Sequence, residues 1–147
     1  MNNSHSIIQF HPEHMRLLVM KPVEARLLDW EYLSAQIASA GAAHTLFIDG
    51  RVVAVYGFVE RFPGVIVVFV VPSVYVSKYP VIVFRHTCRM LNNLEETIRP
   101  LHRIETMAFA SADIDKWMER LGFVCEGVHK NWSRDKDTFK TWARYIE

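Results

Sequence analysis

The chain has 147 residues, of which 50% are hydrophobic and 22% are charged. This composition excludes a disordered chain and predicts one folded domain, residues 1–147, with a substantial core. Lys and Arg number 17 against 16 for Asp and Glu, which gives a formal net charge of +1. Without a strong charge of one sign, neither nucleic acid nor a membrane is expected as a partner.

The N-terminal residues contain no basic region followed by an apolar stretch, so a secretory signal is not expected. The most apolar run, Val65 to Pro72, is too short to cross a bilayer as a helix. The two cysteines, Cys88 and Cys125, form no disulfide or metal framework. Their apolar neighbours predict buried thiols in a reducing compartment.

The first half of the chain predicts strands separated by helices. Apolar residues at helical spacing predict one amphipathic helix over residues 22–40, after a short helix that begins near Pro12. Asp49 and Gly50 predict a two-residue hairpin turn. The expected strands are residues 7–10, 45–48, 51–60 and 65–71. The last is a run of β-branched residues, typical of a central strand covered on both faces.

The second half predicts two further helices and three strands. One helix begins at Pro80 and ends before Pro100, and the other has Ser111 as a plausible N-cap. The expected strands are residues 104–109, 123–132 and 138–146. The last two carry aromatic residues among basic ones, a pattern that also occurs on nucleic-acid surfaces. With a net charge near zero, an alternating strand with one buried face explains this pattern better.

The helix that ends in Leu121-Gly122-Phe123, followed by a strand with Gly127, resembles a segment of the GNAT family of N-acetyltransferases. The order of predicted elements matches the family over residues 7–146. The resemblance implies an α/β (α+β) fold, with a mixed, mostly antiparallel sheet flanked by about four helices. It also implies acetyl-CoA as the cofactor, bound partly by backbone groups of the fourth strand at Val70 and Val71.

The loop before Pro80 departs from the family pattern. In the family, a glycine-rich loop and a helix N-terminus bind the cofactor's pyrophosphate through backbone N–H groups. Here Val76, Lys78 and Pro80 stand where glycines are common, and Pro80 has no N–H to donate. Ser77 and Lys78 are the remaining candidates for a phosphate contact. The alternative is an ordinary connection between a strand and a helix.

The helix of residues 111–121 departs from the family as well. Ser111 stands at the position of a frequent asparagine and is a candidate cofactor contact. Met118 stands where the family often has a tyrosine that protonates the leaving thiolate, and a thioether cannot donate a proton. Trp117, beside it, belongs to the apolar stripe of the helix and is expected in the core.

Two carboxylates are candidates for the general base that an amine acceptor needs. Glu60 ends the third strand and Glu105 lies on the fifth; the alternative for both is a solvated surface residue. His11 and His14 can share a helix face, but no third ligand lies nearby in the sequence, so no metal site is expected.

A narrower resemblance runs through Gly57, Phe62-Pro63-Gly64-Val65, Lys78-Tyr79-Pro80, Leu101-His102-Arg103-Ile104 and Trp117 to Gly127. These segments resemble a phage-encoded subgroup of GNAT-like proteins related to internal virion proteins of podophages. The subgroup lacks the glycine-rich loop. The resemblance implies a component of the virion or an assembly factor, located in the particle or in the cytoplasm of the infected host.

Three hypotheses follow. The first is a non-catalytic GNAT-fold protein that acts through protein partners or self-association, with no cofactor. The second is an acetyl-CoA-dependent N-acetyltransferase with an atypical cofactor loop. The third is a regulatory module that binds CoA or another anion without turnover.

Overall fold

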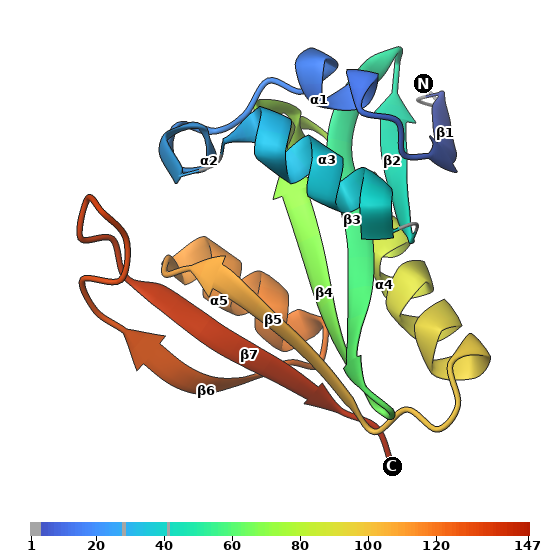
Figure 1. Ribbon diagram of the computed structural model, residues 1–147, viewed down its shortest axis with the longest axis vertical. Helices are drawn as coiled ribbons and strands as arrows, with labels where there is room; N and C mark the ends of the chain where they lie inside the picture. The colour runs from blue at the N-terminus through green and yellow to red at the C-terminus, as the bar shows by residue number, and fades with distance from the viewer. Residues whose placement is uncertain (1–3, 28, 41) are drawn as a thin grey trace. The chain divides into compact units, whose positions relative to one another are not determined.

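The computed structural model describes residues 4–27, 29–40 and 42–147. Seven strands lie in the order β1-β2-β3-β4-β5-β7-β6 (Figure 1). Their bounds are β1 His5–Gln9, β2 Ala43–Ile48, β3 Arg51–Phe62, β4 Val65–Pro72, β5 Arg103–Phe109, β6 Val124–His129 and β7 Phe139–Tyr145. The helices are α1 Glu13–Leu17, α2 Pro22–Leu27, α3 Trp30–Ala40, η1 Val74–Lys78 (a 3-10 helix), α4 Pro80–Thr97 and α5 Ala112–Arg120.

The predicted fold class is confirmed. The pairs β1–β2, β2–β3, β5–β7 and β6–β7 are antiparallel, and β4 pairs with β5 in parallel, so the sheet is mixed and mostly antiparallel. The chain separates into two compact units, Met1–Val59 with Phe69–Phe84, and Glu60–Val68 with Arg85–Glu147. Each unit is described by itself below, and the expectation of a single domain stays a prediction.

The first unit is built around a core between its helices and β2, β3 and β4. Residues Val52 to Gly57 of β3 are buried without interruption. A strand buried on both faces is apolar at every position, which is the pattern that β3 shows here. The buried residues of this core are Phe10, Met15, Leu18, Ile37, Val52, Val55 and Val71.

The predicted helix of residues 22–40 is two helices, α2 and α3, so the prediction of one continuous helix was wrong. Asp29 precedes α3, and its backbone carbonyl accepts a hydrogen bond from the Leu33 N–H at 2.9 Å. Asp is a favoured N-cap residue, so a new helix begins there although the apolar spacing continues. Leu28, which the prediction places within this helix, lies outside the described residues.

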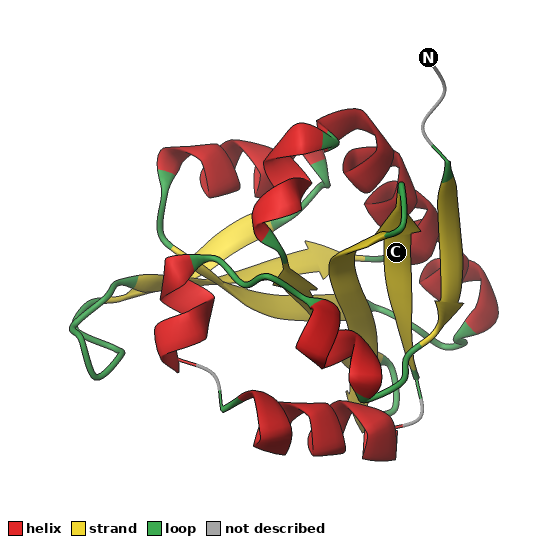
Figure 2. Ribbon diagram, turned by 90° about the horizontal axis from the view of Figure 1, so that it is seen from above, coloured by secondary structure: helices red, strands yellow, loops and turns green. Residues whose placement is uncertain are grey.

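Strand β1 is one edge of the sheet, and Figure 2 shows it on the outside. It pairs with β2 from His5↔Ile48 to Gln9↔His44, and all five of its residues are exposed. The predicted hairpin turn after β2 is confirmed, with Asp49 and Gly50 both at positive φ, 50° and 77°. Both residue types tolerate this conformation, which a two-residue hairpin requires.

The second unit consists of β5, β7 and β6, the end of β3 from Glu60 on, the first part of β4, and the helices α5 and α4 from Arg85 on. The β4–β5 ladder holds three residue pairs, and its last pair is Val67↔Glu105. Thr106 then donates from its hydroxyl to the Val68 carbonyl at 2.9 Å. Arg144 of β7 contacts both helices, since its guanidinium binds the Leu121 carbonyl and Glu95. Both helices therefore lie on the face of the sheet to which Arg144 points.

Burial in the second unit corrects two predictions. Cys125 is exposed and Cys88 is half-buried, so the expectation of two buried thiols was wrong. Cys125 lies on β6, at the other edge of the described sheet, where Val124 and Glu126 are exposed as well. The closing hairpin does not bury one face, because Phe139, Trp142 and Ala143 are all buried on β7. Trp142 and Ala143 are adjacent and point to opposite faces of β7, so both faces of this strand are covered at that point.

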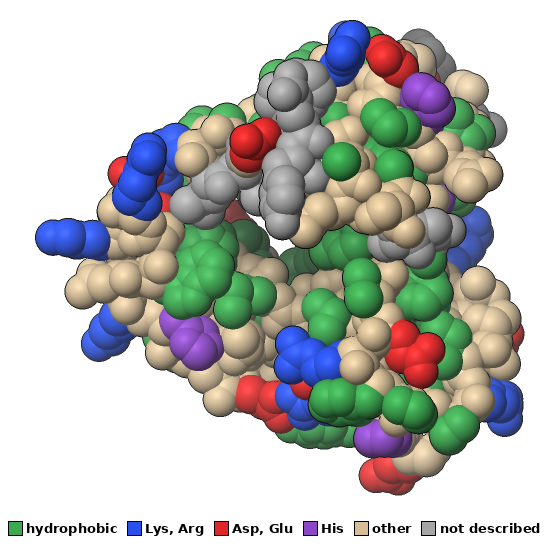
Figure 3. Space-filling view, viewed as in Figure 1, with side chains coloured by type: hydrophobic (Ala, Val, Ile, Leu, Met, Phe, Trp, Pro, Cys, Tyr) green, Lys and Arg blue, Asp and Glu red, His purple; other side chains and the backbone are tan. Residues whose placement is uncertain are grey.

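The surface shows no extended region of one charge on the face drawn in Figure 3, where basic and acidic side chains are interspersed. No helix in the described part of the chain is long and apolar enough to span a membrane.

Candidate cofactor and catalytic residues

In the first unit, the segment after β4 is a 3-10 helix, where the sequence predicted a loop. Ser73 caps η1, and its hydroxyl accepts a hydrogen bond from the Tyr75 N–H at 3.1 Å. Ser73 is fully buried and forms an isolated β-bridge with Met20. The segment between α1 and α2 therefore holds the start of η1 in place.

Three backbone N–H groups in and beside η1 are bound within the chain. The Val74 N–H donates to the Val19 carbonyl at 2.8 Å, and the Val76 N–H donates to the Ser73 carbonyl at 3.3 Å. The Tyr79 N–H donates to the Val76 carbonyl at 3.2 Å, and Pro80 has no N–H. A phosphate cradle requires N–H groups that point at the ligand. Around η1, the N–H groups of Val74, Val76 and Tyr79 therefore already have acceptors within the chain.

Ser77 and Lys78, the two side chains predicted to bind a phosphate, have different surroundings in the structure. The Ser77 hydroxyl donates to the Val74 carbonyl at 3.3 Å, so it already has a partner within η1. Lys78 is exposed, and its ammonium lies 5.7 Å from the centre of the Tyr79 ring. Of the two, Lys78 retains a charged group open to solvent that can meet an anion.

The other predicted cofactor residues of this unit, Val70 and Val71, lie on β4. Val71 is buried and its side chain belongs to the core of the first unit, while Val70 is half-buried. Both come after the last pair of the β4–β5 ladder. Only backbone groups can serve a cofactor there, as the resemblance implies.

In the second unit, α5 carries two positions that the family uses. The Ser111 hydroxyl accepts a hydrogen bond from the Ile114 N–H at 3.2 Å, which confirms its role as the N-cap. Met118 is buried, with 4% of its surface exposed, and its thioether supplies no proton. Trp117 is half-buried, so it lies at the margin of the core.

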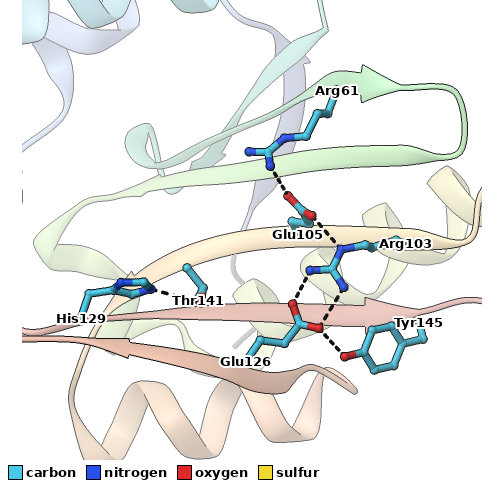
Figure 4. Close-up of polar contacts among 7 residues, drawn as sticks. All are labelled: Arg61, Arg103, Glu105, Glu126, His129, Thr141 and Tyr145. Carbon is cyan, nitrogen blue, oxygen red and sulfur yellow. Dashed lines mark hydrogen bonds and ion pairs between the residues drawn. The ribbon is translucent and has the colours of Figure 1, made fainter.

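Glu105 lies between two arginines on the sheet of the second unit (Figure 4). One carboxylate oxygen accepts from Arg103 Nε at 2.7 Å and the other is 3.2 Å from Arg61 Nη1. Only 19% of the side chain is exposed. A general base needs a free lone pair within reach of the acceptor's proton. Each carboxylate oxygen of Glu105 has one guanidinium partner, and its role as a base stays a prediction.

Arg103 extends this network to β6. Its guanidinium binds both carboxylate oxygens of Glu126, and the Tyr145 hydroxyl donates to the same carboxylate. The hydrogen bonds from Arg103, and then that from Tyr145, lower the pKa of Glu126 to about 2. The hydrogen bonds to Glu126, and then to Glu105, raise the pKa of Arg103 further above its usual value. The network joins three adjacent strands through the charged side chains of Arg103 and Glu126 and the neutral hydroxyl of Tyr145.

Glu60, the other predicted base, is exposed near the end of β3. Among the described residues, no hydrogen bond or ion pair holds its carboxylate. Glu60 thus differs from Glu105, whose two oxygens each have a guanidinium partner.

Sequence analysis did not identify the group formed by Arg61, Arg103, Glu126 and Tyr145. Arg103 and Glu105 are two apart on one strand, so a period of two places them on the same face. Glu126 and Tyr145 join them only through the register of β6 and β7, which the sequence alone does not determine.

No metal site is formed in the described ranges, where no group of three or more potential ligands comes together. His14 instead bonds through Nδ1 to the hydroxyl of Thr45 at 2.7 Å. Burial, and the neighbouring His11, lower the pKa of His14.

Solved structures of acetyltransferases have this fold. Ard1 from Thermoplasma volcanium superposes with a TM-score of 0.76 at 9% identity, covering 97% of this chain and 98% of that one. The ribosomal-protein-S18-alanine N-acetyltransferase from Escherichia coli gives 0.70 at 14% identity, covering 98% and 95%. A GNAT-family acetyltransferase from Bacillus anthracis gives 0.69 at 14% identity, covering 96% and 94%.

No family model and no curated protein sequence matches this chain. The structural similarities, at these identities, establish the GNAT fold of the chain over nearly its whole length. These similarities do not establish the activity of the chain, because proteins with one fold have many different functions.

Proposed function

We propose that this protein uses the GNAT fold to bind other macromolecules and does not transfer acetyl groups. The observation that carries the proposal is the closed hydrogen bonding of Val74, Val76 and Tyr79 within the chain. Those N–H groups would have to break their present bonds before a pyrophosphate could accept from them. Pro80, at the first position of α4, adds no donor.

Two further observations support the absence of catalysis. Met118 offers no proton for a leaving thiolate, and no hydroxyl or thiol replaces tyrosine at that position. Glu105 is held by two guanidinium groups, which favours a structural role for its carboxylate. Each lost role would require a substitute elsewhere in the chain.

The finer part of the proposal is the setting. The resemblance to podophage proteins supports a component of a phage virion or an assembly factor, located in the particle or in the cytoplasm of the infected host. Such a protein acts through contacts with protein partners or with copies of itself.

An N-acetyltransferase with an atypical cofactor site is the second candidate. It is favoured by the names of the similar structures, which are acetyltransferases, and by the free carboxylate of Glu60. In that case Glu60 is the base, Lys78 meets a phosphate, and Val70 and Val71 supply backbone groups to the cofactor.

A thiol-release assay separates the two candidates. The purified protein is incubated with acetyl-CoA and a panel of amines, including polyamines, aminoglycosides and peptides with free N-termini, and free CoA is measured. The non-catalytic proposal predicts no release above the rate without amine. Release that depends on an amine, and that is lost in Glu60→Gln but kept in the matched surface variant Glu96→Gln, would establish the second candidate.

A further inference from the structure

We propose that the open edge of β1 pairs with β1 of a second copy of this chain, antiparallel, about a two-fold axis at Ile7. Strand β1 lies at the outside of the sheet in Figure 1 and Figure 2, with β2 as its one neighbour in the described sheet. Unpaired backbone groups on an edge strand form a template for a further strand.

The hydrogen-bond phase of β1 determines which groups face outward. The Asp49 N–H donates to the Ser4 carbonyl, and the Phe10 N–H donates to the Ala43 carbonyl. Hydrogen-bonded pairs alternate along an antiparallel ladder, so the even-numbered residues bond to β2. The N–H and carbonyl groups of His5, Ile7 and Gln9 therefore point away from β2.

The outward N–H and carbonyl groups of His5, Ile7 and Gln9 can pair with the same groups of a second copy. In an antiparallel pair of β1 strands, the register that uses every outward group places Ile7 opposite Ile7 of the second copy. His5 then lies opposite Gln9, and each hydrogen-bonded pair exchanges two bonds. The Ile7 side chains of the two copies then contact each other across the axis. In the single chain, 47% of the Ile7 surface is exposed.

The charge of the edge also fits a second copy. A two-fold axis brings identical groups together, so a self-pairing edge has to avoid formal charge. Strand β1 contains no Lys, Arg, Asp or Glu and no proline, the residues with which proteins protect edge strands. The opposite edge, β6, differs, because a register shift between Cys125 and Gly127 interrupts it and Glu126 is ion-paired there.

Five paired residues bury less area than a standard interface of about 1,600 Å² requires. The dimer is therefore expected to be weak and to dissociate on dilution. Light scattering after size exclusion, and sedimentation velocity over a wide concentration range, measure this equilibrium.

Two substitutions at Ile7 test the edge. Ile7→Pro removes an outward N–H and leaves the β1–β2 bonds, which the even residues make, in place. Ile7→Lys keeps the backbone and places like charges on the axis. Val128→Lys, on the exposed side of β6, is the matched control.

The proposal predicts a concentration-dependent dimer for the unmodified chain and for Val128→Lys, and a monomer for Ile7→Lys and for Ile7→Pro. Circular dichroism shows whether Ile7→Pro is folded. If Ile7→Pro is unfolded, the oligomeric state of Ile7→Lys alone tests the proposal. A chain that is monomeric at every concentration, or a dimer that survives Ile7→Lys, would overturn the proposal.

Discussion

The Phe69 side chain leaves no room for a Cβ at position 57, which is why glycine is required there. A Cβ built on Gly57 would meet Cζ of Phe69 at 2.2 Å. Phe69 is partly buried and packs against the core of the first unit, so its ring has little room to move. Gly50 provides the contrast, because its φ is +77° and nothing lies within 4 Å of the position of a Cβ.

We predict that Gly57→Ala lowers the free energy of unfolding by about 1–3 kcal/mol, the usual cost of overpacking. Urea denaturation measures this loss. In a double-mutant cycle, Phe69→Leu should recover part of it, since the shorter side chain leaves space for the methyl group. Gly50→Ala is the control, since its loss arises from backbone conformation and should not respond to Phe69→Leu. Equal responses would contradict the steric account.

The contacts of Glu126 predict a pH dependence. Its pKa is lowered to about 2 by Arg103 and then by Tyr145, while an unperturbed glutamate titrates near 4.3. A lowered pKa in the folded state stabilises the protein above the unfolded value. That stabilisation is lost as the pH falls from about 4.3 to about 2.

Thermal unfolding of the unmodified protein and of Glu126→Gln, measured from pH 7 to pH 2, checks this prediction. The unmodified protein should have the higher midpoint at pH 7, and the two curves should converge toward pH 2. If the difference between the two midpoints stays constant from pH 7 to pH 2, the charge of Glu126 does not account for the stability that its contact with Arg103 contributes.

At the scale of elements, the cap of α5 is the local feature most directly open to test. Ser111→Ala removes the acceptor for the Ile114 N–H and should cost about 1 kcal/mol. Ser111→Asp retains an acceptor and adds a negative charge at the helix N-terminus, so it should restore that stability. Chemical denaturation of both variants measures the effect. If the aspartate variant is as unstable as the alanine variant, the cap does not stabilise α5.

Elements were predictable from the sequence where the apolar period and the turn residues agree. The Asp49-Gly50 hairpin and the end of α5 near Gly122, where φ is +85°, belong to this group. The break before α3 was missed because the apolar period continues past Asp29. The 3-10 helix η1 was missed because Val74 to Lys78 has neither a helical period nor the usual turn residues.

The candidate site was less predictable than the fold. The sequence identified Ser111 as a cap and Met118 as unable to donate a proton, since both depend on one helix. The pairing of Glu105 with Arg61 depends on contacts between strands, and the bonding of η1 depends on Val19, far away in sequence. Such contacts follow from strand register and chain packing, which composition and period do not specify.

At the scale of the whole molecule, three elements run through both compact units. The boundaries between the units fall within β3, β4 and α4. We predict that residues 1–147 unfold as one cooperative domain, because neither unit can lose these elements without disturbing the other. Calorimetry and fluorescence should report coincident transitions. Two separate transitions would show that the units are independent domains.

The central claim is that this GNAT-fold chain has no working site for acetyl-CoA. Calorimetric titration of the purified protein with acetyl-CoA, with CoA in a parallel titration, tests it most directly. We predict no saturable heat with either ligand up to millimolar concentration. Saturable binding at micromolar concentration would show that the N–H groups around η1 open for the cofactor, and it would contradict the claim.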